Sequence, residues 1–312
     1  MKKYNLFIFR RDFRIIDNKT LNYAINNLEN IIPVFIFTPE QISDSNKYKS
    51  DNAIQFMIES LKHLDSQLKK NNSKLHIFTG KNIDVLKKIK KNINIESILF
   101  NMDYTPYALK RDEKISAFCK KNKINLIVKE DYLLKNVGEI LKKDKKPYTV
   151  FTPFKNLGRK KEIDRPQKLK IKNLVTCDEL QCDKYIDYEI KDDILVRGGR
   201  DNGISILNSI DKFKNYNVER NNIEINSTHL SAYIKFGCVS IREVYWKIIE
   251  SLGSDNTLID QLFWKEFYFY IAYYFPKVLK GKNYNSKYDN IKWNDDKEKF
   301  KLWCEGKTGF PI

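Results

Sequence analysis

The sequence predicts an α/β fold, in which a doubly wound parallel sheet is followed by an all-α region. Three observations lead to this prediction. Short apolar runs alternate with helical patterns up to about residue 130, helical spacing dominates from about residue 200, and a lysine- and proline-containing stretch lies between them. At 312 residues the chain has the length of about two domains. We therefore expect a sheet domain at 1–130, a connector at 131–199 and a helical domain at 200–312.

Five short apolar runs predict the strands. Each has four to seven residues, is rich in Ile, Val, Leu or Phe and is bounded by polar residues, as buried strands are. The runs are 4–9, 31–37, 74–78, 97–100 and 124–128. Apolar residues three and four apart predict helices between them, most clearly at 53–68 and 83–89. Repeated alternation of strand and helix predicts parallel strands joined by right-handed crossovers.

A sheet of this kind binds ligands beyond the carboxyl ends of its strands. No glycine-rich dinucleotide motif follows any of the runs, and Gly198, Gly199 and Gly203 lack that motif's spacing. The residues alone therefore predict a nucleotide-sized scaffold and leave its ligand open.

Helices are also predicted through the last third of the chain. The ranges are 201–214, 228–236, 240–252 and 257–279. Ser227 and Thr228 predict an amino-terminal cap, and Ser240 with Glu243 predicts a capping box. The last helix is apolar on nearly every face, which is typical of the centre of a helical bundle. Because only about thirty residues follow it, we expect the helical domain to be incomplete.

Charge and composition narrow the function classes. Lys and Arg number 57 against 40 Asp and Glu, a net charge of +17, which fits a nucleic-acid partner and equally a solvated lysine-rich surface. Five cysteines and three histidines do not make a disulfide scaffold or a polyhistidine metal site, and we predict no metal. The apolar run 6–9 is too short for a signal peptide, and no stretch is long enough to span a membrane. We expect a soluble, intracellular protein.

Six motifs along the chain resemble those of the DNA photolyase and cryptochrome family. In order they are LFIFRRDFRIIDN (6–18), DYTPYALKRD (103–112), FTPF (151–154), STHLSAYIKFGCVSIRE (227–243), QLFWKEFYFY (261–270) and WCEGKTGFPI (303–312). The resemblance implies an antenna-type α/β domain followed by an incomplete helical domain that binds flavin adenine dinucleotide (FAD). It also implies that the α/β domain either holds a light-harvesting folate or deazaflavin or holds no chromophore.

The resemblance assigns a group of residues to the flavin. A helix amino terminus lined with hydroxyl groups suits the FAD pyrophosphate, which supports this assignment. The residues expected to bind FAD are Tyr216, Ser227, Thr228, His229, Leu230, Ser231 and Lys265.

The resemblance also assigns residues to DNA and to electron transfer. Gln261 and Trp264 are three apart and therefore share a helical face. They are expected to receive a pyrimidine pair flipped out of ultraviolet-damaged DNA, with Trp264 stacking on it and Gln261 hydrogen-bonding its edge. Arg220 matches a DNA phosphate contact, and Trp293 matches the outermost tryptophan of the photoreduction chain. The implied reaction is light-driven repair of pyrimidine dimers by electron transfer from reduced FAD.

The sequence departs from the family at three places. Lys265 stands where arginine is usual, so a point charge replaces a bidentate fork. Gln261 stands where enzymes for cyclobutane dimers commonly have glutamate; we favour cyclobutane dimers and keep a (6-4) photolyase or a cryptochrome-like photosensor as the alternative. The chain also stops inside the motif GKTGFPI. We therefore expect a truncated protein: half of an enzyme completed by a separately encoded carboxyl-terminal fragment, a non-catalytic binding module or an inactive remnant.

Overall fold

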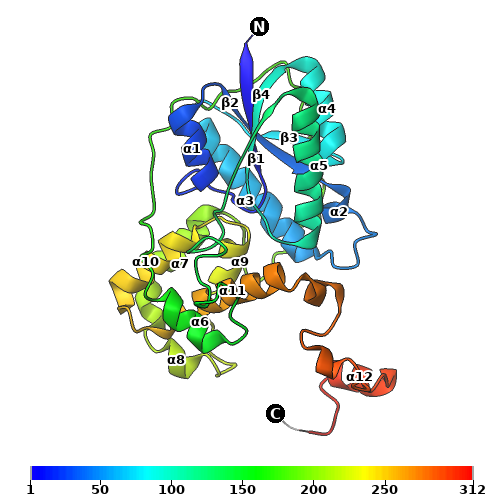
Figure 1. Cartoon of the computed structure of the whole chain (residues 1–312), viewed down its shortest axis with the longest axis vertical. Helices are drawn as coiled ribbons and strands as arrows, with labels where there is room; N and C mark the ends of the chain where they lie inside the picture. Colours follow the sequence, from blue (N-terminus) through cyan, green and yellow to red (C-terminus); the bar gives the residue numbers. More distant parts are fainter. Residues whose placement is uncertain (1, 311–312) are drawn as a thin grey trace.

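The computed structural model describes residues 2–310 and contains the predicted sheet (Figure 1). All five strands are parallel and lie in the order β3-β2-β1-β4-β5. Their bounds are β1 Lys3–Phe9, β2 Ile31–Phe37, β3 His76–Thr79, β4 Asn94–Asn101 and β5 Asn125–Lys129. The central strand β1 pairs with both halves, so that Leu6 lies opposite Ile32 on one side and Ile98 on the other. The predicted doubly wound sheet is confirmed.

Helices cover both faces of the sheet because side chains alternate along each strand. Phe7 and Phe9 of β1 pack with α1 and α3, whereas Leu6 and Ile8 pack with α4 and α5. The helix bounds are α1 Lys19–Asn27, α2 Pro39–Ile42, α3 Asp51–Lys69, α4 Asn82–Asn92 and α5 Pro106–Asn122. Strand order reverses between β1 and β4, and a ligand site is therefore expected where these two strands end.

A long, mostly irregular connector follows β5 and contains one helix, α6 (Phe151–Gly158). It runs back along the sheet domain (Figure 1), where the Val175 amide donates to the Ile31 carbonyl at 2.8 Å. Farther on, the Asp183 amide donates to the Ile77 carbonyl at 2.8 Å. These bonds add backbone partners to the β2–β3 side of the sheet.

The remaining helices form the lower part of the molecule in Figure 1. Their bounds are α7 Arg200–Asn208, η1 Ile210–Phe213, α8 Tyr216–Glu219, α9 Leu230–Lys235, α10 Ile241–Leu252, α11 Thr257–Tyr274, η2 Pro276–Lys280, η3 Ser286–Tyr288 and α12 Lys297–Cys304. The predicted helix 201–214 is divided into α7 and η1. The predicted helix 257–279 ends early, because Pro276 has no amide hydrogen and restricts the backbone of Phe275.

The two predicted caps have different outcomes. Ser240 and Glu243 form the expected capping box at α10. The expected cap of α9 by Ser227 or Thr228 is wrong by one or two residues, because His229 takes the cap position with a left-handed φ of 51°. Thr228 still contributes, since its Oγ1 accepts from the Leu230 amide at 3.3 Å.

Helix α11 is buried on one side and exposed on the other. Phe263 and Tyr270 are fully buried, and Gly158 of α6 leaves so little space that an added Cβ would lie 2.6 Å from the Phe263 ring. On the opposite side Tyr268 is 62% exposed. The helix therefore carries the apolar surface that its sequence predicts, and part of that surface faces solvent.

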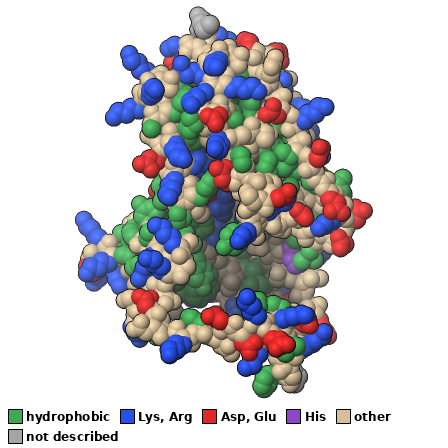
Figure 2. Space-filling view, turned by 90° about the vertical axis from the view of Figure 1, so that its right-hand side faces the viewer, with side chains coloured by type: hydrophobic (Ala, Val, Ile, Leu, Met, Phe, Trp, Pro, Cys, Tyr) green, Lys and Arg blue, Asp and Glu red, His purple; other side chains and the backbone are tan. Residues whose placement is uncertain are grey.

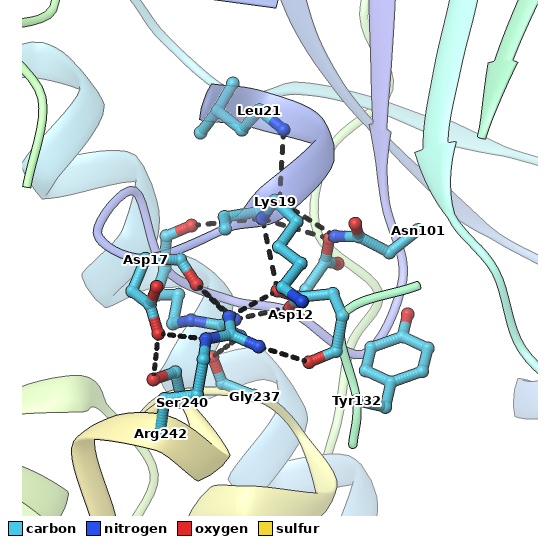
Figure 3. Close-up of polar contacts among 12 residues, drawn as sticks. Asp12, Asp17, Lys19, Leu21, Asn101, Tyr132, Gly237, Ser240 and Arg242 are labelled. Atoms are coloured by element: carbon cyan, nitrogen blue, oxygen red, sulfur yellow. Dashed lines mark hydrogen bonds and ion pairs between the residues drawn. The ribbon is translucent and has the colours of Figure 1, made fainter. Parts of the chain in front are cut away.

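A buried charged network joins the sheet domain to α10 (Figure 3). Arg14 pairs with Asp131 and donates to the carbonyls of Asp17 at 2.7 Å and Gly237 at 3.2 Å. Arg242 of α10 pairs with Asp17 at 2.8 Å and with Asp131 at 2.7 Å. Burial alone would raise the pKa of Asp131, but Arg14 and Arg242 lower it to about 2. The network fixes the start of the connector and α10 against the loop after β1.

Candidate functional site

A cavity of about 530 Å³ lies between the loop after β1 and the helices α8, α9, α10 and α11. Figure 2 shows the face of the molecule that is hollowed between the sheet domain and the helical part. Eight of the sequence-predicted site residues line this cavity: Tyr216, Ser227, Thr228, His229, Leu230, Ser231, Gln261 and Lys265. Residues separated by almost fifty positions are thus brought to one place.

Three other sequence-predicted residues do not line the cavity. Trp264 stacks on Phe151 of α6, with ring centroids 3.5 Å apart and planes within 9°. Trp264 is therefore not among the residues that line the cavity with Gln261, and its role toward DNA stays a prediction. Arg220 is exposed at the end of α8, and Trp293, 75% exposed, lies between η3 and α12.

The start of α9 forms a polar wall of the cavity. His229 has φ 51°, a left-handed conformation that is uncommon outside glycine but that His adopts more often than most residues. The residues around this turn, from Ser227 to Ser231, line the cavity together and bring their hydroxyl groups and the start of α9 to it. Amide and hydroxyl donors at a helix start suit an anionic group.

The carboxyl end of α9 is held by the loop after β1 and by Arg200 of α7. Four successive carbonyls each accept one hydrogen bond: Lys235 from Arg11 Nε at 3.2 Å, Phe236 from the Phe13 amide at 3.1 Å, Gly237 from Arg14 Nη1 at 3.2 Å and Cys238 from Arg200 Nη1 at 2.9 Å. These bonds satisfy carbonyls that a helix end leaves without partners, and the arginines complement its dipole.

Gly237 makes this attachment possible. Its φ is +64°, and an added Cβ would lie 2.3 Å from the Arg11 carbonyl oxygen and 2.5 Å from the Cα of Asp12. Glycine is the residue that combines a positive φ with so close an approach of two backbones. The cavity wall formed by α9 is consequently positioned by the sheet domain.

Three cationic side chains line the cavity: Arg11, Lys235 and Lys265. Arg11 retains 29% side-chain exposure and makes one ion pair, with Asp103 at 3.3 Å. Lys265 donates to the Tyr132 carbonyl and lies 4.8 Å from the centre of the Phe269 ring. Burial lowers the pKa of Lys265 to about 8, partly offset by the adjacent Glu266.

The cavity also has an apolar lining, contributed mainly by α10 and α11. It consists of Ile234, Val244, Ile248, Leu258, Leu262 and Phe269. A cavity lined by cations, hydroxyl groups and apolar side chains suits a ligand that combines phosphate with a flat ring system.

A second cavity, of about 440 Å³, lies where the strands β1 and β4 end. Its lining includes Arg10 and Arg11 after β1, and Asp103 and Thr105 after β4. Arg10 is nearly buried, pairs with Asp112 at 2.8 Å and stacks over a phenylalanine ring of β4. This is the place where the sheet topology predicts a ligand. Arg11 lines both cavities and separates them.

Sequence reasoning missed two of the charged lining residues. Arg11 and Lys235 lie inside motifs that the resemblance rests on, but the sequence assigns them no role. Position within the motifs RRDFR and YIKFG is the signal that could have identified them. Among residues 2–310 no group of three or more His, Cys, Asp or Glu side chains could hold a metal ion. None of the helices described is long and apolar enough to cross a membrane.

Comparison with protein-family models gives two matches. The model described as DNA photolyase matches residues 5–170, and the model described as the FAD binding domain of DNA photolyase matches residues 258–312. The first match alone covers more than half of the chain, and the two together include the sheet domain and α11.

Known proteins match nearly the whole chain. A "(6-4)DNA photolyase" of Arabidopsis thaliana is 28% identical over 98% of the chain and 61% of its own length. A "deoxyribodipyrimidine photo-lyase" of Alkalihalophilus pseudofirmus is 28% identical over 97% of the chain and 66% of its own length. The crystal structure of an archaeal photolyase from Sulfolobus tokodaii with two FAD molecules superposes with a TM-score of 0.84 at 34% identity, over 99% of this chain and 68% of that one. The chain thus spans less than two thirds of the length of both curated relatives.

Proposed function

Because this chain belongs to the DNA photolyase and cryptochrome family, we propose that its larger cavity binds FAD and that the whole protein repairs pyrimidine dimers in ultraviolet-damaged DNA by a light-driven reaction. One observation carries the proposal. The cavity unites the hydroxyl-lined start of α9 with Tyr216 of α8 and with Gln261 and Lys265 of α11, two other parts of the chain. Cyclobutane dimers are our favoured lesion.

The residues present fit FAD. Ser227, Thr228 and Ser231 offer hydroxyl donors for the pyrophosphate, and Arg11 and Lys265 add positive charge. The apolar lining on α10 and α11 suits the flat ring system. The chemistry that FAD supplies when bound is light-driven, redox-neutral electron transfer, which opens the bonds that link the two pyrimidines.

Within this proposal, Trp264 is the platform on which a flipped-out base stacks. The Phe151 ring lies parallel to its indole at 3.5 Å, the separation at which a nucleobase would stack. Phe151 therefore covers the face of Trp264 on which a base would stack, and we expect it to move when DNA binds. It is half-buried and also packs against Phe267, so this movement gives up two aromatic contacts that the stacked base would have to replace.

The remaining proposed contacts lie outside the cavity. Arg220 is exposed at the end of α8 and is proposed to contact a DNA phosphate. Trp293 is proposed to exchange electrons with solvent reductants, for which its 75% exposure is suitable.

The second cavity, where β1 and β4 end, is proposed to hold a second, light-harvesting chromophore. The Sulfolobus relative carries two FAD molecules, according to its description, and is 34% identical to this chain. FAD therefore joins folate and deazaflavin as a candidate. The buried Arg10 and the half-buried Arg11 supply charge for a phosphate or carboxylate of any of the three.

A (6-4) photolyase or a cryptochrome-like photosensor is the second candidate function. The observation that favours it is Gln261, which lines the cavity where the family's cyclobutane-dimer enzymes commonly place glutamate. A Gln261→Glu variant tests this directly. If the wild type repairs cyclobutane dimers, the variant is expected to repair them faster; if the wild type repairs only (6-4) products, the variant should lose that activity.

The first experiment is flavin retention. The purified chain is incubated with FAD, desalted and examined by visible absorption; a structured flavin band is expected. A Ser227→Ala, Ser231→Ala variant should retain about tenfold less FAD, because charge-assisted hydrogen bonds to the pyrophosphate are lost. Ser66→Ala, Ser116→Ala is the matched control, since both serines are exposed on α3 and α5.

Three outcomes decide the proposal. Retained flavin followed by repair of a defined dimer under blue light would support it. An empty spectrum that is restored by co-expression with a carboxyl-terminal fragment of a relative would assign the activity to a two-chain enzyme. An empty spectrum under both conditions would mean that this cavity does not bind FAD, and the inactive remnant becomes the better interpretation.

A further inference from the structure

The helices α4 and α5 carry an unusual concentration of positive charge. Residues 81–95 and 110–125 contain eleven Lys and Arg but three Asp and Glu. These 31 residues are a tenth of the chain and hold nearly half of its net charge of +17. Both helices cover the same face of the sheet (Figure 1), and Figure 2 looks onto the side that carries them, where blue side chains outnumber red ones in the upper part.

Most of these lysines have no acidic partner among the described residues. Among the lysines of this surface, Lys87 forms an ion pair with Asp84 at 3.8 Å, and both side chains are mostly exposed. The lysines without an ion pair are Lys81, Lys88, Lys90, Lys91, Lys110, Lys114, Lys120, Lys121 and Lys123, all exposed. Lysines in the last turn of a helix complement its dipole, whereas Lys110 and Lys114 lie farther from either end of α5 and gain nothing from it.

The lysines are spaced to meet successive phosphates. Lys87 and Lys91 stand four apart on the outer face of α4, and Lys110, Lys114 and Lys121 share one face of α5. Such neighbours are one helical turn apart or a multiple of it, about 5–6 Å per turn, and their long side chains can reach the roughly 7 Å repeat of a nucleic-acid strand.

The ends of the two helices meet around a hollow of about 340 Å³. Its lining includes Lys90, Lys91 and Lys123, and also Asn92 and Asn122, whose side-chain amides donate to the carbonyls of Lys88 and Phe118. Lys123 adopts a left-handed φ of 57° at the carboxyl end of α5, a position where glycine is the favoured residue. Three ammonium groups around one hollow form a suitable place for a phosphate group.

We propose that the surface of α4 and α5, from Lys87 to Lys123, binds the phosphate backbone of double-stranded DNA as a second contact outside the cavity. The proposal does not depend on FAD or on a lesion, and it stands if the proposed function fails. This surface would use nearly half of the net positive charge to bind undamaged duplex without regard to sequence. Such binding would keep the protein on DNA.

The lysine run of the connector provides the contrast. Lys143, Lys145 and Lys146 surround Asp144, which pairs with Lys146 at 3.4 Å. That carboxylate keeps its charge, because the amide and side chain of Lys146 lower its pKa. In the connector run one carboxylate stands among three lysines, whereas the surface on α4 and α5 has three carboxylates among eleven Lys and Arg.

The test measures binding of the full chain, without flavin, to an undamaged fluorescent duplex across a salt series. The variant Lys90→Gln, Lys91→Gln, Lys123→Gln is compared with Lys143→Gln, Lys145→Gln, Lys146→Gln, which removes the same charge. Each phosphate contact contributes about 0.9 to the slope of log K against log salt. The first variant should lower the slope by about 2 to 3 and the affinity at least about tenfold, and the control should change either quantity little.

Several results would overturn the proposal. Equal losses in both variants would assign binding to net charge alone, and an unchanged slope in the first variant would place the DNA elsewhere. Polyglutamate or single-stranded RNA that competes as well as duplex, at equal charge concentration, would assign the surface to another partner. Circular dichroism and the melting temperature show that the first variant is folded, so that a loss of binding reports the missing lysines.

Discussion

Arg11 and Arg14 lie three residues apart on one loop and are used in opposite ways. Arg14 is 2% exposed, and its two Nη atoms are engaged with Asp131 and with the carbonyls of Asp17 and Gly237. Arg11 is partly exposed, pairs with Asp103 at 3.3 Å, donates from Nε to the Lys235 carbonyl and lines the cavity. The same residue type thus forms a buried structural contact at Arg14 and provides a partly available positive charge at Arg11.

The difference teaches how to separate structural from functional charge in this molecule. Where the loop after β1 meets α10, Arg14 and Arg242 have buried carboxylate or carbonyl partners. A ligand could not bind either arginine without breaking these contacts. At the cavity the cations keep part of their surface and lack strong acidic partners. Substitutions at the interface should therefore change stability, and substitutions at the cavity should change affinity.

The largest expected effect is that of Arg242→Met. It leaves Asp17 with an unpaired buried charge and removes one of the two arginines that hold Asp131, and breaking a buried pair in this way costs about 3–5 kcal/mol of unfolding free energy. Urea denaturation measures the loss. Lys3→Met, which removes an exposed pair with Glu96, is the control and should cost less than about 1 kcal/mol. Comparable losses in the two variants would refute the structural role of the network.

Gly237→Ala should have the next largest effect. An added Cβ meets two backbone atoms within 2.5 Å at a φ of +64°, so α9 has to separate from the loop after β1. Gly253→Ala is a matched control, because its φ is +83° with nothing within 4 Å of the added Cβ. The control should lose about 1 kcal/mol from backbone strain alone, and Gly237→Ala about 2 kcal/mol more, together with flavin retention. Equal losses would mean that the close approach is unimportant.

Much of the fold could be predicted because the sheet is buried on both faces. Continuous apolar runs located all five strands to within about three residues, and the run 31–37 matches β2 at both ends. The helices were predicted less well where one residue decides the outcome. Pro276 shortened α11, and His229 replaced a serine or threonine as the cap of α9. Periodicity does not carry information about either event.

The site was predicted in part, for a similar reason. The motif around 227–231 is local in sequence, so its resemblance to a family motif located one cavity wall. Asp131 pairs with both Arg14 and Arg242, each more than a hundred positions away, and no spacing rule predicts these pairs. Trp264 illustrates the same limit, because its partner Phe151 comes from the connector.

Arg11→Gln tests the cavity side of the comparison. It removes the ion pair with Asp103 and the hydrogen bond from Nε to the Lys235 carbonyl, neither of them fully buried, so the free energy of unfolding should fall by about 1 kcal/mol, less than for Arg242→Met. FAD affinity, measured by fluorescence titration, should fall about tenfold through loss of a charge-assisted hydrogen bond. A large loss of stability with unchanged affinity would place Arg11 with Arg14 as a structural residue and would break the comparison.

The smallest effect is expected from Lys265, and it depends on pH. Burial lowers its pKa to about 8, so the side chain is charged below pH 8 and neutral above it. A charged Lys265 attracts the FAD phosphates, and affinity should therefore fall about threefold to fivefold as pH rises from 7 to 9. The neighbouring Glu266, whose pKa burial raises to about 7, becomes negatively charged at a lower pH than that at which Lys265 loses its charge, and this also lowers affinity for the phosphates. Arg11, Asp103 and Asp131 are the other charged groups that act on Lys265.

Lys265→Arg separates the effect of Glu266 from that of Lys265, because arginine stays charged throughout. The variant should keep any change near pH 7 and lose the change near pH 8. If it loses neither, the positive charge of Lys265 does not contribute to binding, and the lysine is a structural tie to the Tyr132 carbonyl, as Arg14 is to Gly237.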